Sequence, residues 1–135
     1  MTLTPEQKAR MVEAEKLNIQ LESVERRLQG LARSRAEARD LLAALDQMPS
    51  IVEGDELLVP LATGIFVRAK ARAGSGFFLN VGDGVVVEKS AQDVRAMVTS
   101  QLERIDAQET ALQAQFEIGL EHLDELRESF APKEE

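Results

Sequence analysis

The segment Leu57–Lys89, LLVPLATGIFVRAKARAGSGFFLNVGDGVVVEK, places the strongest constraint on the fold of this 135-residue chain. Runs of about five Val, Ile, Phe and Leu residues are separated by Gly, Pro or Ser, a spacing that predicts short strands joined by tight turns. We expect four strands, at 57–61, 65–71, 77–81 and 85–89. They pair as two hairpins, across Ala62-Thr63-Gly64 and across Gly82-Asp83-Gly84.

Both faces of these predicted hairpins carry large apolar side chains. Because side chains alternate along a strand, Ile65 and Val67 lie on one face, whereas Phe66 lies on the other. Two hairpins alone are marginally stable and need another layer. We therefore interpret the segment as an oligomerisation module whose missing layer comes from partner chains. Its expected contact residues, the hairpin surface, are Leu58, Leu61, Ile65, Phe66, Val67, Phe77, Phe78, Leu79, Val81, Val85, Val86 and Val87.

The remainder of the composition indicates long helices rather than a large globular core. Charged residues make up 30% of the chain and aromatic residues only 4%, with no Trp or Tyr. The net charge is −8, and residues 101–135 alone hold ten acids and three bases. No cluster of Lys and Arg occurs, so a nucleic-acid partner is not expected. The absence of Cys excludes disulfides and thiolate chemistry. Without a long apolar run or a leader segment, we expect a soluble cytoplasmic protein with no membrane partner.

The residues before the hairpins predict one long helix, from the start of the chain to Met48. Thr4-Pro5-Glu6-Gln7 has the form of a capping box with Pro in the first turn, and Pro49 disfavours a helical residue before it. Apolar residues recur at steps of three and four, which predicts a coiled-coil seam interrupted by Arg35. The expected seam residues are Leu17, Leu21, Val24, Leu28, Leu31, Leu42 and Leu45.

A second long helix is predicted after the hairpins, opened by the Ser90-x-x-Asp93 box. Its seam residues are Val98, Leu102, Ile105, Leu112 and Phe116, followed by Gly119, Leu123, Leu126 and Phe130, with Glu109 as a charged interruption. The chain thus divides into a helix at 1–48, a linker with two hairpins at 49–90, a helix at 91–131 and a charged tail at 132–135.

The fold class that follows is mostly α with a small β module: a long antiparallel coiled coil with two β-hairpins inserted between its helices. Neither helix has an apolar face wide enough for a globular core, so each seam is expected to cover the other. Joining Met48 to Ala91 sets a register in which paired residue numbers sum to about 140. That register brings Arg35 near Glu109, a polar pair that we expect to specify alignment.

The end of the coiled coil that carries both termini is predicted to be incompletely covered. The first helix offers Gln7, Arg10 and Ala14 at seam positions, where the second helix offers larger apolar residues. We interpret this end as a client-binding surface; ordinary fraying with a few exposed aliphatic side chains is the alternative. The residues of this tip surface are Leu3, Met11, Val12, Ile19, Ile118, Leu120, Leu123, Leu126 and Phe130.

Neither a catalytic site nor a metal or cofactor site is expected. His122 is the single histidine, and we interpret it as a solvated residue of the helix face. Gly82-Asp83-Gly84 precedes a strand, whereas a phosphate-binding loop leads into a helix. The acidic residues around Glu121 and Glu125 spread over an outward helical face, so solvation is favoured over a carboxylate site.

The order helix, two hairpins, helix resembles the α-type subunit of prefoldin over essentially the whole chain. The specific part is the strand segment: Leu-Val-Pro-Leu at 58–61, Gly-Ile-Phe-Val at 64–67 and Val-Gly-x-Gly-Val-Val-Val-Glu-Lys at 81–89. This resemblance implies an archaeal-like co-chaperone subunit in a hexamer of two α-type and four β-type subunits, so its partners include a second copy of itself. It further implies ATP-independent capture of non-native proteins between coiled-coil tips and their delivery to a group II chaperonin.

Two other functions are compatible with the same layout. In a structural scaffold or prefoldin-like filament, the β module polymerises instead of closing. In a tethering adaptor, the tips bind one folded partner. Stoichiometry separates the filament from the hexamer, and preference for unfolded proteins separates a chaperone from an adaptor.

Overall fold

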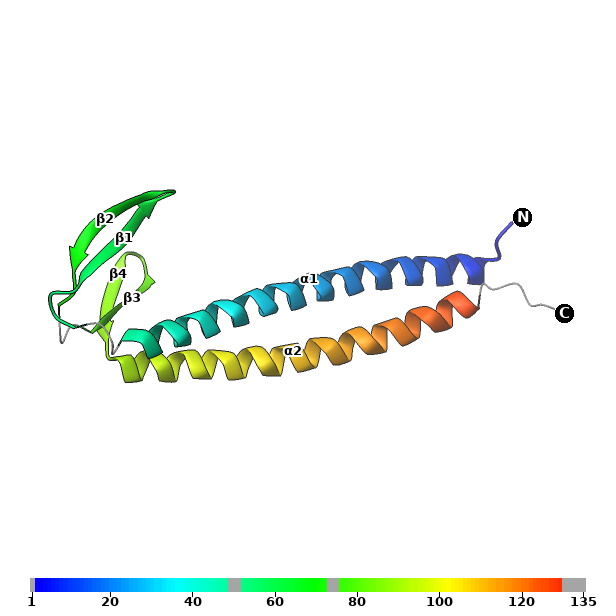
Figure 1. Ribbon diagram of the computed structural model, residues 1–135. Coiled ribbons are helices and arrows are strands. Elements are labelled where there is room, and N and C mark those ends of the chain that lie inside the picture. The colour runs from blue at the N-terminus through cyan, green and yellow to red at the C-terminus, as the bar shows by residue number, and fades with distance from the viewer. Residues whose placement is uncertain (1, 49–51, 73–75, 130–135) are drawn as a thin grey trace. The chain divides into compact units, whose positions relative to one another are not determined.

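The computed structural model describes residues 2–48, 52–72 and 76–129 and has the predicted fold class. In chain order its elements are α1 (Pro5–Gln47), β1 (Glu56–Ala62), β2 (Ile65–Lys70), β3 (Phe77–Gly82), β4 (Val85–Lys89) and α2 (Ala91–Glu128) (Figure 1). The two helices pack antiparallel, with both hairpins between them in sequence. The predicted end of the second helix, including Phe130 and Pro132, lies outside the described residues.

Both helices begin at the predicted caps. The Gln7 N–H donates to Thr4 Oγ1 over 3.1 Å, and the Thr4 N–H donates to Gln7 Oε1 over 3.0 Å, which completes the capping box of α1. At the start of α2, the Asp93 N–H donates to Ser90 Oγ over 3.1 Å. These bonds satisfy amide donors that have no partner within the helix.

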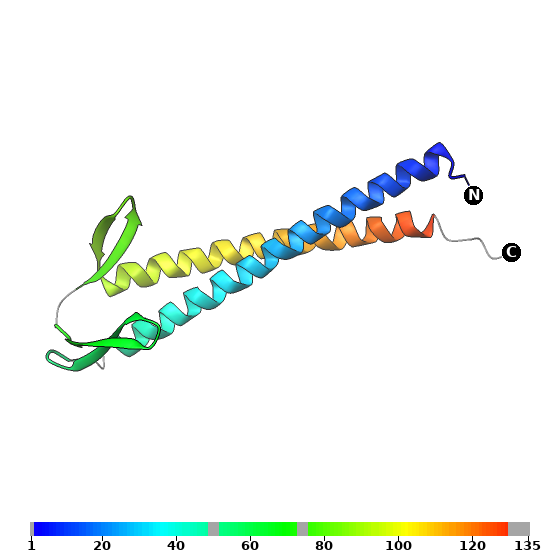
Figure 2. The ribbon, with the colours of Figure 1, turned by 90° about the horizontal axis from the view of Figure 1, so that it is seen from above.

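The four strands form two separate antiparallel hairpins, β1–β2 and β3–β4, seen as two ribbons in Figure 2. The β3–β4 turn is made by Asp83 (φ 50°) and Gly84 (φ 74°), the Asp-Gly pair with positive φ at both residues that suits the twist of a hairpin. Gly64, at φ 75°, occupies the turn of the β1–β2 hairpin. The predicted turns are therefore confirmed, and each requires its glycine.

Each hairpin contains an irregularity just before its turn. Pairing shifts between Pro60 and Ala62 in β1 and between Asn80 and Gly82 in β3. Pro60 stands opposite Phe66 at the start of the first shift, on a strand that pairs with β2 alone. This position suits a proline, because a residue without an amide hydrogen is tolerated at an edge strand or a bulge and not in the middle of a sheet.

The chain divides into two compact units. The arm unit comprises residues 1–36 and 103–135, and the hairpin unit comprises residues 37–102. Within the arm unit, α1 and α2 bury Leu21, Val24, Ile105 and Leu112 between them, at the predicted three–four steps. The cross-helix pair of Arg35 with Asp106 has residue numbers that sum to 141, close to the expected 140, whereas His122 with Glu13 sums to 135, about one and a half helical turns away.

The hairpin unit has a small apolar core of its own. Ala38 and Leu45 of α1 are buried with Val94 and Val98 of α2, and Leu42, Leu102, Phe77 and Leu79 pack against this cluster. Arg95 pairs with Asp46 across the two helices. Val98 is the first α2 residue of the predicted seam, and the buried Val94 extends that seam by one step toward the hairpins. The seam of the hairpin unit is thus formed by packed side chains.

Candidate interaction surfaces

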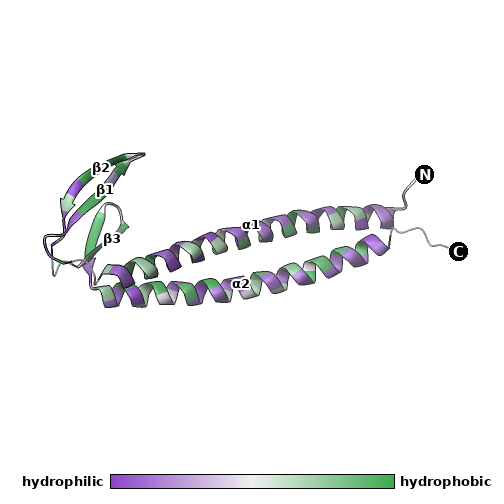
Figure 3. Ribbon diagram, viewed as in Figure 1, coloured by the Kyte–Doolittle hydropathy of each residue, from purple (hydrophilic) through white to green (hydrophobic). Residues whose placement is uncertain are grey.

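The hairpin surface is apolar and open to solvent. Large hydrophobic residues are exposed on both faces of the strands, and the hairpins are coloured largely hydrophobic in Figure 3. Phe66 and Phe78 are 56% and 66% exposed. Contiguous apolar area of this kind indicates an interaction surface. Its exposed members are Leu58, Val59, Leu61, Ile65, Phe66, Val67, Phe78, Val81, Val85 and Val86, among which Val59 had not been assigned to it.

Two residues that we expected to contact partner chains pack against helices of this chain instead. Phe77 and Leu79 are partly buried and pack against the helical cluster of the hairpin unit. Leu79 stands opposite Val87, which is also partly buried, whereas Phe78 stands opposite Glu88 and is exposed. Part of one face of β3–β4 is therefore covered by α1 and α2, whereas Phe78, Val81, Val85 and Val86 stay exposed.

The tip surface is present in part. Leu3, Met11, Val12, Ile19, Ile118 and Leu120 are exposed, with Ile19 and Ile118 at 60% and 68%. Leu123 and Leu126, however, are only 4% and 8% exposed, so the prediction that they lack a covering partner is wrong. Phe130 lies outside the described residues. Apart from Leu3, which lies at a seam step before Gln7, the exposed apolar residues of this surface lie off the seam.

Burial at this end of the seam extends to α1. Gln7, Arg10, Ala14 and Leu17 are all partly buried, at the three–four steps of the predicted seam. The aliphatic stem of a long polar side chain covers apolar area while its polar end stays in water. A polar residue at a seam position is therefore compatible with packing, which hydrophobicity alone did not indicate.

An open groove of about 230 Å³, the Gly119 groove, lies beside the seam of the arm unit. It lies beside Gly119, a buried seam position without a side chain, onto whose backbone Leu21 packs. A β-carbon built on Gly119 would lie 2.6 Å from Leu21 Cδ2. The groove is lined by Leu17, Gln20, Leu21 and Val24 of α1 and by Gln115, Ile118, Gly119 and His122 of α2.

His122 lines the groove and joins the two helices. Its Nε2 lies 2.9 Å from Glu13 Oε1, and its Nδ1 lies 3.9 Å from Glu125 Oε2. Its side chain is about half exposed. The interpretation of His122 as a merely solvated residue is therefore too simple, because the ring also bridges α2 to α1.

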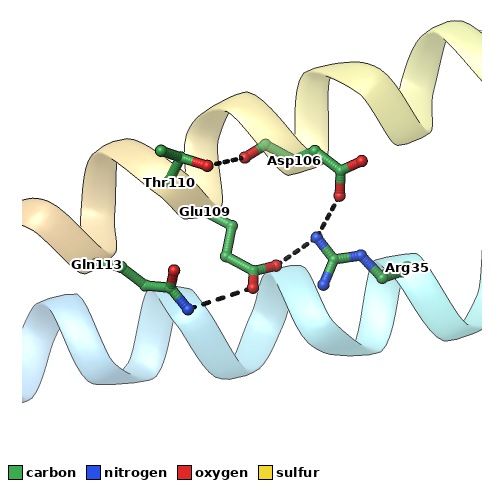
Figure 4. Close-up of polar contacts among 5 residues, drawn as sticks. All are labelled: Arg35, Asp106, Glu109, Thr110 and Gln113. Carbon is green, nitrogen blue, oxygen red and sulfur yellow. Dashed lines mark hydrogen bonds and ion pairs between the residues drawn. The ribbon is translucent and has the colours of Figure 1, made fainter.

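The charged interruptions of the seam form one polar cluster, shown in Figure 4. The Arg35 guanidinium points between two carboxylates of α2 and donates to both Asp106 and Glu109. Gln113 Nε2 also donates to Glu109 over 3.3 Å. The side chains of Arg35 and Glu109 are only 21% and 25% exposed. The predicted pairing of Arg35 with Glu109 is confirmed; Asp106 and Gln113 were not foreseen.

This cluster stabilises the charged form of Arg35. The pKa of Arg35 is raised above its ordinary value, chiefly by its hydrogen bond to Glu109 and further by its bond to Asp106 and the two negative charges; burial acts against this. Since the folded pKa of Arg35 exceeds the unfolded one, the protonation of Arg35 contributes stability that is fully present below the unfolded pKa, with Asp106 and Glu109 in their charged form. That contribution of Arg35 is lost as the pH rises through the folded value, at strongly alkaline pH.

The described residues offer little for other chemistry. In residues 2–48, 52–72 and 76–129, no three His, Cys, Asp or Glu side chains are grouped so that they could hold a metal ion. Gly82-Asp83-Gly84 leads into β4, as a hairpin turn does. Over the same ranges, neither helix contains an apolar window long enough to cross a bilayer.

Comparison with known proteins connects this architecture to one family. The sequence profile of the prefoldin subunit family matches residues 17–133. The α subunit of prefoldin from Methanothrix thermoacetophila is 35% identical over 98 residues, an alignment that covers 70% of this chain and 63% of that protein. Human prefoldin subunit 5 is 36% identical over 76 residues, covering 51% of this chain and 47% of its own length. The matched region is thus less than two thirds of these relatives.

A solved structure has the same fold. One chain of filamentous prefoldin from Methanocaldococcus jannaschii superimposes with a TM-score of 0.74, covering 87% of this chain and 97% of that one. The sequences are 18% identical, so this likeness concerns the fold.

Proposed function

The chain belongs to the α class of the prefoldin subunit family, a family of chaperones without enzymatic activity, and from this premise we propose that it is a co-chaperone subunit that captures non-native proteins without ATP. The observation that carries the proposal is the set of exposed off-seam apolar residues on the arm unit, above all Ile19 and Ile118. Each such side chain contributes on the order of 1 to 3 kcal/mol when buried against a client. Several arms acting together hold a client that one arm releases.

The hairpin surface supports the second half of the proposal, assembly with other subunits. We propose a closed hexamer of two copies of this chain with four β-type subunits, which work in the cytoplasm and deliver clients to a group II chaperonin. Strands whose outer edges are unpaired and whose exposed face is apolar form a sheet readily with another chain. In β1–β2 both faces carry such residues, which suits contacts with more than one neighbour.

The test of client capture uses substitutions outside the seam. Ile19→Asp with Ile118→Asp should preserve the helix pair, because both side chains are mostly exposed, and should weaken suppression of client aggregation measured by light scattering. Leu41→Asp is the matched control: Leu41 is an exposed leucine of α1 in the hairpin unit and should leave suppression unchanged. Leu126→Asp is unsuitable as a test, since Leu126 is buried. Full suppression by the double variant would refute capture at this surface.

A filament-forming scaffold is the second candidate, favoured by the unpaired strand edges and by the likeness to a chain of a filamentous prefoldin. Mass measurement of the purified chain, alone and with a co-expressed β-type subunit, separates the two. A closed hexamer that forms only with the partner supports the co-chaperone. Open-ended self-assembly of the chain alone supports the scaffold.

A further inference from the structure

The Gly119 groove has the size and walls of a site for one large apolar side chain. Its floor and sides come from Leu17, Leu21 and Val24 of α1 and from Ile118 of α2, and its volume is about 230 Å³. Gly119 adds no side chain to the lining, and the space directly above its backbone is taken by Leu21, which a β-carbon there would meet at 2.6 Å. Ile118 forms one wall and remains 68% exposed, so the groove has apolar surface still to be covered.

The polar groups at the groove carry a definite charge. His122 contacts Glu13 at one nitrogen and lies within 4 Å of Glu125 at the other. Whether or not the ring is protonated, two carboxylates against one imidazole leave this end of the groove negative. Glu121, three residues after Ile118 on the same helix, adds a third carboxylate near the outer wall.

Lys16 of α1 does not cancel this charge by pairing. Lys16 lies one turn before Gln20 on α1, and no ion pair joins it to Glu13 or Glu125 among the described residues. The α2 part of the arm unit is strongly acidic overall, since residues 101–135 hold ten acids and three bases. A negative surface attracts cationic partners over distances of about a Debye length and raises their rate of association.

From the groove and its charge we propose that the Gly119 groove binds non-native segments in which a large apolar residue is flanked by Lys or Arg. The apolar side chain enters the groove beside Ile118, and the flanking cation lies at the Glu13, His122 and Glu125 end. Gln20 and Gln115 line the groove and offer amide donors and acceptors to the backbone of an extended segment. This inference rests on the proposed capture of non-native proteins and names the class of segment that is captured.

The test uses the full chain in its assembled state and three labelled peptides of equal length. Each peptide carries a central Leu-Phe pair, flanked by Lys, by Gln or by Glu, and binding is followed by fluorescence anisotropy at low and high salt. The Lys-flanked peptide should bind most tightly at low salt, by roughly threefold for each exposed carboxylate that it meets, and high salt should reduce the preference.

Three variants locate the preference. Glu125→Lys should remove or reverse it, and Ile118→Ser should weaken all three peptides alike, because it removes apolar wall without changing charge. Glu103→Lys makes the same charge change elsewhere on α2 of the arm unit and should leave the preference intact. Circular dichroism of each variant checks that the helices persist.

The outcomes distinguish this inference from the proposed function. If wild-type protein suppresses aggregation but binds the three peptides equally, the basic-flanked specificity is wrong and client capture stands. If Glu103→Lys removes the preference as fully as Glu125→Lys, net charge acts and the groove does not. If no peptide binds and aggregation is not suppressed, the proposed function itself fails.

Discussion

Gly119→Ala should destabilise the helix pair although alanine favours helices. Alanine is better than glycine inside a helix by about 1 kcal/mol, and Gly119 lies well within α2. The added β-carbon, however, would stand 2.6 Å from Leu21 Cδ2 and 3.8 Å from Leu17 Cδ1. Leu21 is only 7% exposed, so it cannot move aside into solvent without giving up its own packing.

Gly30→Ala is the matched control. Gly30 lies within α1, and a β-carbon there meets nothing within 4 Å. Overpacking a filled site costs about 1 to 3 kcal/mol, and this cost falls on Gly119→Ala alone. We therefore expect Gly30→Ala to raise the free energy of unfolding by about 1 kcal/mol and Gly119→Ala to leave it unchanged or lower it by up to about 2 kcal/mol. The two variants should differ by about 1 to 3 kcal/mol.

Urea unfolding followed by far-UV circular dichroism measures this difference, at equal protein concentration and in the same assembly state. A double-mutant cycle assigns the cause: Leu21→Ala should cost less in the Gly119→Ala background than in the wild type, because the smaller side chain admits the new methyl group. Equal stabilisation by Gly30→Ala and Gly119→Ala would show that Leu21 does not pack onto the Gly119 backbone.

Three further predictions concern the seam, a cap and the polar cluster. Leu102→Asp places a carboxylate against the core of the hairpin unit and should cost at least about 2 kcal/mol; an unaltered melting curve would show that the seam is wrongly assigned. Ser90→Ala removes the bond to the Asp93 N–H and should cost about 1 kcal/mol, whereas Ser100→Ala, exposed inside α2, should cost nothing by the same urea titration. Arg35→Leu leaves Glu109 without its cation and should lower the melting temperature. The double variant Arg35→Leu with Glu109→Leu should restore the melting temperature while admitting other registers of the helix pair. If distances between spin labels on α1 and α2 show that the double variant keeps the native register, the polar pair does not specify alignment.

Local patterns predicted most of the fold because each element carries its own signals. The boxes at Thr4 and Ser90 give the helix starts, and Asp83-Gly84 gives the hairpin turn, since few sequences accept positive φ at two successive residues. The three–four spacing predicted the seam. The joining of Met48 to Ala91 through the hairpin module predicted its register. That register brought Arg35 to Glu109, as the geometry of an antiparallel pair requires.

The candidate surfaces were predicted less well, because exposure depends on what lies across the interface. Leu123 and Leu126 were expected to be open, yet both are buried, although α1 offers residues as polar as Arg10 at that end of the seam. Phe77 and Leu79 were assigned to partner chains, yet the helices of the same chain pack on them. The only feature of the sequence that relates to the Gly119 groove is a glycine at a seam position of the heptad pattern, and this feature does not by itself predict a groove.

The sequence by itself determined the order of elements, the turns, the caps and the alignment of the two helices, because these depend on residues near one another or on a fixed spacing. Only the tertiary structure decided which apolar side chains stay exposed, where the seam leaves a groove, and that one imidazole joins Glu13 to the acidic helix. The physical reason is that the burial of a side chain depends on the surface that packs against it. In this helix pair, that surface consists of residues about a hundred positions away in the chain, and a local sequence pattern does not record their size and reach.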